Sequence, residues 1–241
     1  GTGKGAEYGV LIKGGEPLEA ANNIKAIVFD KTGTLTKGKP EVTDIISLGV
    51  VDEEEIAAIA GGLEKLSEHP LAEAIVRYAE EESIGIASVN EFQAIPGHGV
   101  EGSIKGIKYH LGNRKLISDK LNLEIGASER KVRKLEEAGK TVMILANEKE
   151  IVGLIAVADT LKENSLEAVR QLQKKGIEVY MITGDNQRTA NAIAKQVGIV
   201  NVLAEVLPED KAEEIKKILE ERAKATPTPT DQILTGAATS R

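Results

Sequence analysis

The feature that most constrains the fold is a strict alternation of strand and helix patterns in the last third of the chain. The strands are predicted at 177–182 and 199–204, and the helices at 160–175, 188–197 and from 208 onward. Gly176 and Gly198 stand directly behind two of these helices, where helices commonly end. This order of elements predicts βαβ units, and therefore a parallel sheet covered by helices.

A further strand of the same sheet is predicted near the beginning of the chain. Residues 24–29 form a short apolar run with β-branched side chains, and the run ends abruptly at Asp30, Lys31 and Thr32. A polar loop at the carboxyl end of a strand is where open α/β sheets bind their ligands. We therefore expect the chemistry of this unit to lie at Asp30.

The middle of the chain has a different, mixed pattern. It predicts two helices, a hairpin, a third helix and two strands, at 53–66, 70–79, 100–111, 128–139, 141–146 and 151–158. Such a block predicts an independent α+β domain inserted into the parallel-sheet domain. The expected parts are 1–38 and 154–224 for the parallel-sheet domain, 39–153 for the insertion, and 225–241 as a disordered or foreign tail rich in Thr and Pro.

Composition excludes several classes of function. Hydrophobic residues make up 41% and charged residues 29% of the chain, as in ordinary globular proteins. The formal net charge is −7 without a basic run, so no nucleic-acid partner is expected. The absence of cysteine excludes disulfides and thiolate metal sites. No apolar run approaches the ~20 residues that a membrane-spanning helix needs.

The seven residues from Asp30 to Thr36, with the sequence DKTGTLT, resemble the phosphorylation motif of the P-type ATPases. The catalytic domain of that family has the haloacid-dehalogenase-like fold, so the expected fold is an α/β parallel-sheet domain of this type with an inserted α+β nucleotide-binding domain. The resemblance implies that Asp30 accepts the γ-phosphoryl group of ATP. The small residues after Asp30 agree with this role, because their backbone N–H groups can hold phosphoryl oxygens.

Thr32 separates two enzymatic interpretations. Phosphatases of this fold usually carry a second Asp two residues after the nucleophile, which serves as general acid and then as the base that activates water. Because Thr32 cannot do this, we expect an aspartyl-phosphate that persists, as a pump requires. The alternatives are a haloacid-dehalogenase-like phosphatase and a non-catalytic nucleotide-binding module.

Other segments match further motifs of the family. The loop Thr183-Gly184-Asp185-Asn186 resembles the family's second loop, so Thr183 and the Gly184 amide are expected to hold phosphoryl oxygens, with Asp185 beside them. Lys211 corresponds to the cation near the acyl phosphate. The resemblance also implies Mg²⁺ as a cofactor, with Asp30 and Thr32 among its ligands. Asp159 with Lys162 resembles a third motif, although a helix cap by Asp159 or Thr160 is nearly as simple an interpretation.

The inserted block resembles the nucleotide-binding domain of the heavy-metal-transporting branch of this family. The resemblance rests on Ser67-Glu68-His69-Pro70-Leu71, Gly97-His98-Gly99 and Gly112-Asn113-Arg114. It implies that His69 packs beside the adenine of ATP and that Glu64 contacts the base. Gly97, Gly99, Gly112 and Asn113 complete the expected nucleotide site, where glycine lets the backbone approach a ligand closely.

The likeness extends over residues 1–221, so we expect a fragment of a pump whose membrane and actuator domains are its partners. It would then lie at the cytoplasmic face of a membrane, and copper is the favoured ion of this branch. The family's next strand, ending in Gly-Asp-Gly-x-Asn-Asp, has no counterpart in the sequence. We therefore expect impaired phosphorylation, retained nucleotide binding and an exposed sheet edge beside 24–29.

Overall fold

The computed structural model describes residues 2–7, 9, 15, 21–67, 69–225 and 232–236. The chain divides into two compact units. The first contains residues 1–35, 163–184 and 194–241, and the second contains 36–162 together with 185–193. The domain boundaries predicted from the sequence, after residue 38 and before residue 154, stay a prediction.

The first unit is built on a four-stranded parallel sheet in the order β10-β1-β8-β9. Its strands are β1 (Ile24–Asp30), β8 (Glu178–Ile182), β9 (Asn201–Leu203) and β10 (Gln232–Gly236). Asp30 is the last residue of β1 and stands opposite Ile182, the last residue of β8. The predicted parallel sheet is therefore present, with its central strands ending side by side.

Strand β10 differs from the expectation for the tail. Gln232–Gly236 pair in parallel with β1, with Phe29 opposite Gly236, so the sheet edge expected to be exposed carries another strand. The remaining residues of 226–241 lie outside the described residues. The Thr- and Pro-rich composition of the tail did not predict this strand, whose two apolar residues are Ile233 and Leu234 and which pairs with β1.

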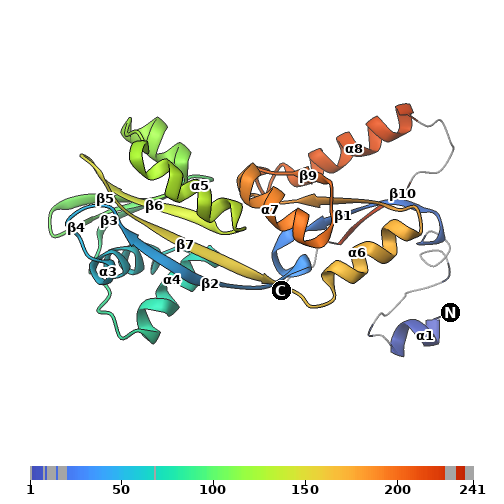
Figure 1. Cartoon of the computed structure of the whole chain (residues 1–241), viewed down its shortest axis with the longest axis horizontal. Helices are drawn as coiled ribbons and strands as arrows, with labels where there is room; N and C mark the ends of the chain where they lie inside the picture. Colours follow the sequence, from blue (N-terminus) through green and yellow to red (C-terminus); the bar gives the residue numbers. More distant parts are fainter. Residues whose placement is uncertain are drawn as a thin grey trace. The chain divides into compact units, whose positions relative to one another are not determined.

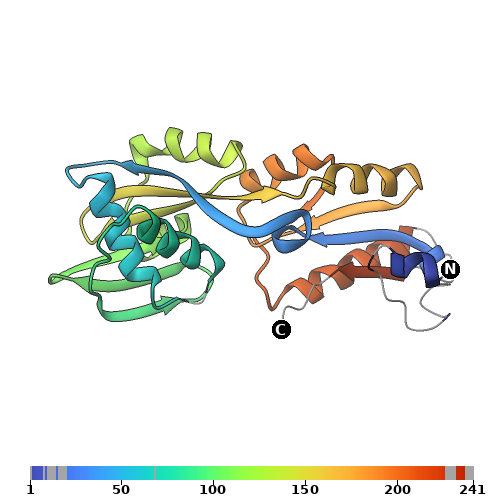
Figure 2. The ribbon, with the colours of Figure 1, turned by 90° about the horizontal axis from the view of Figure 1, so that it is seen from below.

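Helices cover both faces of this parallel sheet. They are α6 (Ser165–Lys174), α8 (Lys211–Ala225) and the end of α7 (Gln187–Val197), and α1 (Thr2–Glu7) precedes them in the chain. Figure 2 shows α6 and α8 on opposite sides of β1. Val28 and Ile182 pack with Ile218 of α8 in the core, which fixes the sheet end that carries Asp30.

The second unit is built on a six-stranded antiparallel sheet in the order β2-β7-β6-β5-β4-β3. Its strands are β2 (Thr36–Ser47), β3 (Asn90–Ile95), β4 (Gly99–Ile104), β5 (Ile107–Gly112), β6 (Thr141–Asn147) and β7 (Ile151–Leu161). The predicted hairpin is β4 and β5, turning at Lys105 and Gly106, which both have positive φ as its tight turn requires.

Both faces of this sheet are covered, which explains the nearly continuous apolar sequences of β6 and β7. Helices α3 (Glu53–Glu64) and α4 (Pro70–Glu81) lie on one face, and α5 (Glu129–Glu137) lies on the other (Figure 1). The short turns η2 (Leu116–Lys120) and η3 (Gly126–Ser128) precede α5. Met143 and Leu145 belong to the core under α3, whereas Val142 and Ile144 belong to the core under α5.

Helix starts follow the sequence signals. Asp52 caps α3, because its carboxylate accepts a hydrogen bond of 2.8 Å from the N–H of Glu55, and Pro70 occupies the first turn of α4. The sequence analysis did not predict β2 or β3, since neither shows a clean alternation of apolar side chains. No helix among the described residues is long and apolar enough to cross a membrane.

Candidate functional site

Asp30 is held at the tip of the first unit's sheet by a tight turn. The turn η1 (Lys31–Leu35) follows β1 directly, and Gly33 within it has φ 75° and ψ −11°. This left-handed conformation is accessible to glycine at little cost, which is why a glycine is needed three residues after the carboxylate. Thr32 is extended, with φ −74° and ψ 125°. The turn therefore leaves Asp30 at the sheet end, with about a third of its side chain exposed.

Lys211 is the partner of Asp30. Its Nζ lies 2.9 Å from Oδ2 of Asp30, and the two side chains are partly exposed, at 29% and 34%. Lys211 is the first residue of α8, so a helix that begins 181 residues later supplies this cation. The structure therefore places the Lys211 ammonium group directly at the Asp30 carboxylate.

The loop after β8 lies at the same end of the sheet. Ile182 is opposite Asp30, and Thr183 follows it as a buried residue with 3% exposure. The N–H of Thr183 donates to the carbonyl of Leu203, and its own carbonyl accepts from the N–H of Val206. These bonds fix the loop, while Gly184 is exposed. The strand order therefore brings Asp30, Lys211 and the Thr183–Gly184 loop of the first unit together.

Asp185 groups with the second unit. Its Oδ1 accepts a hydrogen bond of 3.0 Å from the hydroxyl of Thr141. Asn186 caps the start of α7, because its Oδ1 accepts from the N–H groups of Arg188 and Thr189. Asp185 is therefore engaged by the second unit in this structure.

Asp159 does not cap a helix. It lies in β7, and its carboxylate accepts from the hydroxyl of buried Thr36 at 2.5 Å and from the N–H of Gly38 at 3.1 Å. Residue 164, an asparagine, precedes α6 instead. Asp159 therefore ties the start of β2 to β7, and the helix-cap interpretation is wrong.

The oxygen donors at Asp30 are of a kind that Mg²⁺ can use. Mg²⁺ accepts one or two protein carboxylates, completed by water and substrate phosphates. Asp30 supplies one carboxylate and Thr32 adds hydroxyl and carbonyl oxygens, so the donors are of the right chemical type. No group of three or more His, Cys, Asp or Glu side chains among residues with described positions would hold a metal alone. The site therefore fits Mg²⁺ only if phosphate and water oxygens complete the coordination that the protein begins.

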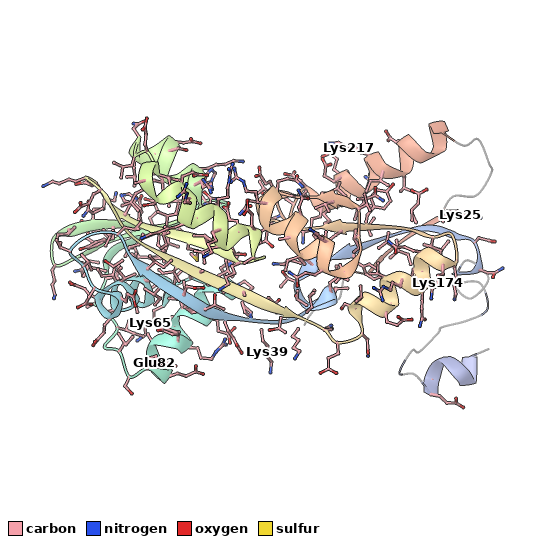
Figure 3. The ribbon with its side chains drawn as sticks, in the orientation of Figure 1. Lys25, Lys39, Lys65, Glu82, Lys174 and Lys217 are labelled. Carbon is pink, nitrogen blue, oxygen red and sulfur yellow. The ribbon has the colours of Figure 1, made fainter. Side chains whose placement is uncertain are left out.

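The second unit contains a cavity of about 440 Å³ beside the junction of α3 and α4. Its lining residues are Glu64, Lys65, Ser67, His69, Glu73, Val76, Arg77 and Glu80. Lys65, at the end of α3, marks this region in Figure 3. Glu64 and His69, predicted together from the sequence, do line one cavity. Glu73, Arg77 and Glu80 were not predicted as site residues, although their spacing of three and four residues places them on one face of α4.

His69 also has a structural role in this cavity. It precedes α4, and its Nδ1 accepts a hydrogen bond of 3.2 Å from the N–H of Leu71. The imidazole therefore caps the helix while its ring lies at the cavity.

The predicted glycines form a separate cluster that does not line the cavity. Gly99 and Gly112 face each other across β4 and β5, and a Cβ on Gly99 would lie 2.2 Å from the carbonyl oxygen of Leu111. The amide of Asn113 donates to the carbonyl of Gly97 at 2.9 Å, and its Oδ1 accepts from the N–H of Leu116. Close packing of backbone on backbone accounts for Gly99 and Gly112 without a ligand.

Glu64 predicts a pH dependence of stability. Burial raises its pKa from 4.5 to about 7, against a smaller lowering by the hydrogen bond with Ser67. Because the folded pKa is the higher one, the wild type loses stability as pH rises from the unfolded pKa through the folded one. Glu64→Gln should remove this loss, at most about 3 kcal/mol, and be the more stable protein above pH 7. Urea unfolding at several pH values measures the difference, and parallel curves for the two proteins would contradict it.

A parallel sheet with Asp30, Lys211 and the Thr183 loop at its carboxyl end defines the first unit as an α/β domain of the open-sheet class. The chain belongs to the haloacid dehalogenase-like hydrolases, whose family model matches residues 24–226. Within this family it is similar to copper-transporting P-type ATPases.

Two relatives illustrate the similarity in sequence. A probable copper-importing P-type ATPase A of Enterococcus hirae is 49% identical over 220 residues, which are 90% of this chain and 29% of that protein. The probable copper-transporting ATPase PacS of Synechococcus elongatus is 47% identical over 219 residues, with the same shares. The chain thus spans less than a third of the length of these curated relatives.

Solved structures show the same similarity. The catalytic domain of the CPx-ATPase CopB-B, studied for conformational changes upon nucleotide binding, has a TM-score of 0.68 and 25% identity over 97% of this chain and 79% of its own. A zinc-transporting PIB-type ATPase in the E2.Pi state has a TM-score of 0.63 and 34% identity over 91% and 35%. The predicted fold class is confirmed.

Proposed function

We propose that this chain is the ATP-binding and aspartyl-phosphate-forming region of a copper-translocating P-type ATPase. The observation that carries the proposal is the contact of 2.9 Å between Asp30 and Lys211 at a sheet end that also bears the Thr183–Gly184 loop. The names of the relatives support it, because the proteins of Enterococcus hirae and Synechococcus elongatus are both described as copper ATPases.

In the proposed reaction, a carboxylate oxygen of Asp30 attacks the γ-phosphorus of ATP. The new bond is the acyl-phosphate O–P bond, the bond that breaks joins the γ-phosphorus to the β–γ bridging oxygen, and ADP leaves. Lys211 offsets negative charge on the transferring group, while the Thr183 hydroxyl and Gly184 N–H hold its oxygens. Asp30 and Thr32 would hold Mg²⁺, and the ion would neutralise further negative charge on the phosphates.

Thr32 explains why the product should persist. Hydrolysis of an acyl phosphate requires a base that activates water, and the residue two positions after Asp30 has a hydroxyl in place of a carboxylate. The aspartyl-phosphate is then available to drive a conformational change of a longer protein. We also propose that this conformational change drives copper transport. The chain would then act together with membrane and actuator domains, at the cytoplasmic face of a membrane.

Two measurements on this chain test the proposal against its alternatives. We expect ATP binding by calorimetry together with incorporation of labelled γ-phosphate that hydroxylamine removes, as it does from acyl phosphates. Incorporation should be slow, because Asp30 supplies one carboxylate for Mg²⁺. Binding without any label would favour the nucleotide-binding module, and rapid turnover of a phosphomonoester would favour the phosphatase.

The cavity of the second unit is the proposed adenine site, and His69 provides a test of it. His69→Ala removes both the ring and the helix cap, so we expect ATP affinity to fall roughly tenfold, the effect of losing base stacking. Stability should also fall by about 1 kcal/mol through loss of the cap. His69→Asn is the matched control, because its carbonyl keeps an acceptor for the N–H of Leu71. If His69→Asn binds ATP as the wild type does, the ring has no role in binding.

A further inference from the structure

The turn that follows Asp30 is held at its far end by a side chain from a distant segment. Leu35, the last residue of η1, is buried, and its carbonyl oxygen accepts a hydrogen bond of 2.7 Å from the hydroxyl of Ser165. Ser165 is the first residue of α6, whose last residue, Lys174, is labelled in Figure 3. The bond therefore ties the turn to a helix that begins 130 residues later.

This bond explains why a serine stands at position 165. Serine is a weaker helix former than alanine, and a buried hydroxyl is costly unless it is hydrogen-bonded. Ser165 is buried, and the single proton of its hydroxyl goes to the carbonyl of Leu35. The side chain thus serves the turn that carries the nucleophile.

The start of the same turn is fixed by the sheet. Asp30 ends β1 and is paired with Ile182 of β8. Between the two ends the backbone is irregular, because Thr32 is extended and Gly33 is left-handed. An irregular stretch of five residues has no repeating hydrogen-bond ladder, so its path depends on how its ends are held.

The bond to Ser165 anchors the turn within the first unit. The chain enters the second unit at Thr36, so Leu35 is the last residue of the turn's own unit. Ser165 belongs to the first unit, as do Asp30 and Lys211. Both ends of the turn are therefore fixed to the unit that contains the proposed nucleophile.

Resting on the proposed function, we propose that Ser165 is a positioning residue for phosphoryl transfer to Asp30. By holding Leu35, it keeps the Asp30 carboxylate and the main chain at Thr32 where in-line attack on the γ-phosphorus begins. A displacement of about 1 Å at reacting atoms can slow a reaction roughly a hundredfold. Loss of this bond should therefore slow the formation of the acyl phosphate and leave ATP affinity unchanged.

The test measures the rate of hydroxylamine-sensitive labelling from γ-labelled ATP, at several ATP concentrations, in four proteins. They are the wild type, Ser165→Ala, Ser165→Thr and Val169→Ala. Threonine keeps a hydroxyl at position 165. Val169→Ala is the matched control, because Val169 is fully buried in the same helix and its truncation destabilises the fold without removing the bond to Leu35.

We expect the labelling rate at saturating ATP to fall by roughly ten- to a hundredfold in Ser165→Ala. The ATP concentration that gives half of the maximal rate should not change, because the proposed adenine site lies in the second unit. Ser165→Thr should recover most of the rate, and Val169→Ala should keep the wild-type rate. Circular dichroism establishes that each protein is folded under the assay conditions.

Amide hydrogen exchange gives a readout that does not depend on activity. In Ser165→Ala the amides of residues 31–35 should exchange faster relative to those of β1, because the far end of the turn opens locally. In Val169→Ala this ratio should stay at its wild-type value, since a cavity under α6 does not release the turn.

Ser165→Cys is the second variant if Ser165→Ala does not fold. A thiol fills nearly the same space as the hydroxyl and is a weaker donor, and the chain has no other cysteine. Its labelling rate should fall in the same direction as that of Ser165→Ala. If neither variant folds while Ser165→Thr does, Ser165 is needed for folding, and its assignment as a positioning residue is overturned.

Two further results would overturn the inference while the proposed function stands. The first is a wild type that is labelled together with a folded Ser165→Ala that is labelled at the same rate. The second is an equal loss of rate in Ser165→Ala and Val169→Ala, which would make the effect one of general stability. A wild type that is never labelled would instead overturn the proposed function, and the inference with it.

Discussion

Asp30→Asn is expected to reduce the hydroxylamine-sensitive label from γ-labelled ATP to background. The amide has no anionic oxygen to attack phosphorus, and the change removes the charge that Lys211 meets at 2.9 Å. The cavity that is the proposed adenine site lies in the second unit, so ATP affinity should be unchanged. Gel autoradiography of the denatured protein measures the label, and calorimetry measures binding.

Asp119→Asn is the matched control, because it makes the same change at an exposed carboxylate of η2 in the second unit. It should be labelled as the wild type is. Lys211→Met should slow labelling without abolishing it, since it removes a stabilising cation and leaves the nucleophile. Label that persists in Asp30→Asn would mean that another residue is phosphorylated, and the proposed mechanism would fail.

Gly99→Ala is expected to destabilise the protein by about 4 kcal/mol, the combined order of backbone strain and overpacking. Its φ of 148° is unfavourable for other residues, and the added Cβ would lie 2.2 Å from the carbonyl oxygen of Leu111 and 2.6 Å from Cα of Gly112. Backbone atoms of a paired strand cannot move aside without breaking the ladder. Urea unfolding monitored by circular dichroism measures the change.

Gly106→Ala separates the two causes. Gly106 has φ 81° in the turn of the same hairpin, but a Cβ there meets no atom within 4 Å. Its cost should therefore be limited to the strain of the backbone conformation, about 1 kcal/mol. If Gly99→Ala proves as mild as Gly106→Ala, the packing of β4 on β5 does not explain this glycine, and a role in approaching the nucleotide becomes the better explanation.

The sequence predicted those parts of the fold that local chemistry dictates. The apolar run before Asp30 became β1, the helix expected at 53–66 became α3, and the hairpin expected at 100–111 became β4 and β5. Each depends on residues within a few positions of one another. Glu64 and His69 were placed together by the resemblance to a known family, and the structure has both side chains lining one cavity at the junction of α3 and α4.

Long-range pairing was beyond local patterns. Strand β2 has no clean alternation in its sequence, and its pairing with β7 is visible only in the structure. The role of Asp159 is visible only because Thr36 and Gly38 donate hydrogen bonds to it across more than 120 residues. Gly99 and Gly112 looked like ligand contacts in the sequence, yet the register of β4 and β5 sets them against each other. The burial of Glu64, which raises the pKa of its carboxyl group, is likewise visible only in the structure.

The sequence by itself determined the strand that ends at Asp30, the turn that needs Gly33, and the family to which the chain belongs. These properties are written in contiguous residues, and conformational preference acts over a few positions. Only the tertiary structure decided that Lys211 meets Asp30, that β10 closes the sheet edge beside β1, and that Glu64 is buried with an unsatisfied oxygen. Distances between side chains and their burial depend on contacts between segments that are far apart in the sequence, and a local sequence pattern does not specify such contacts.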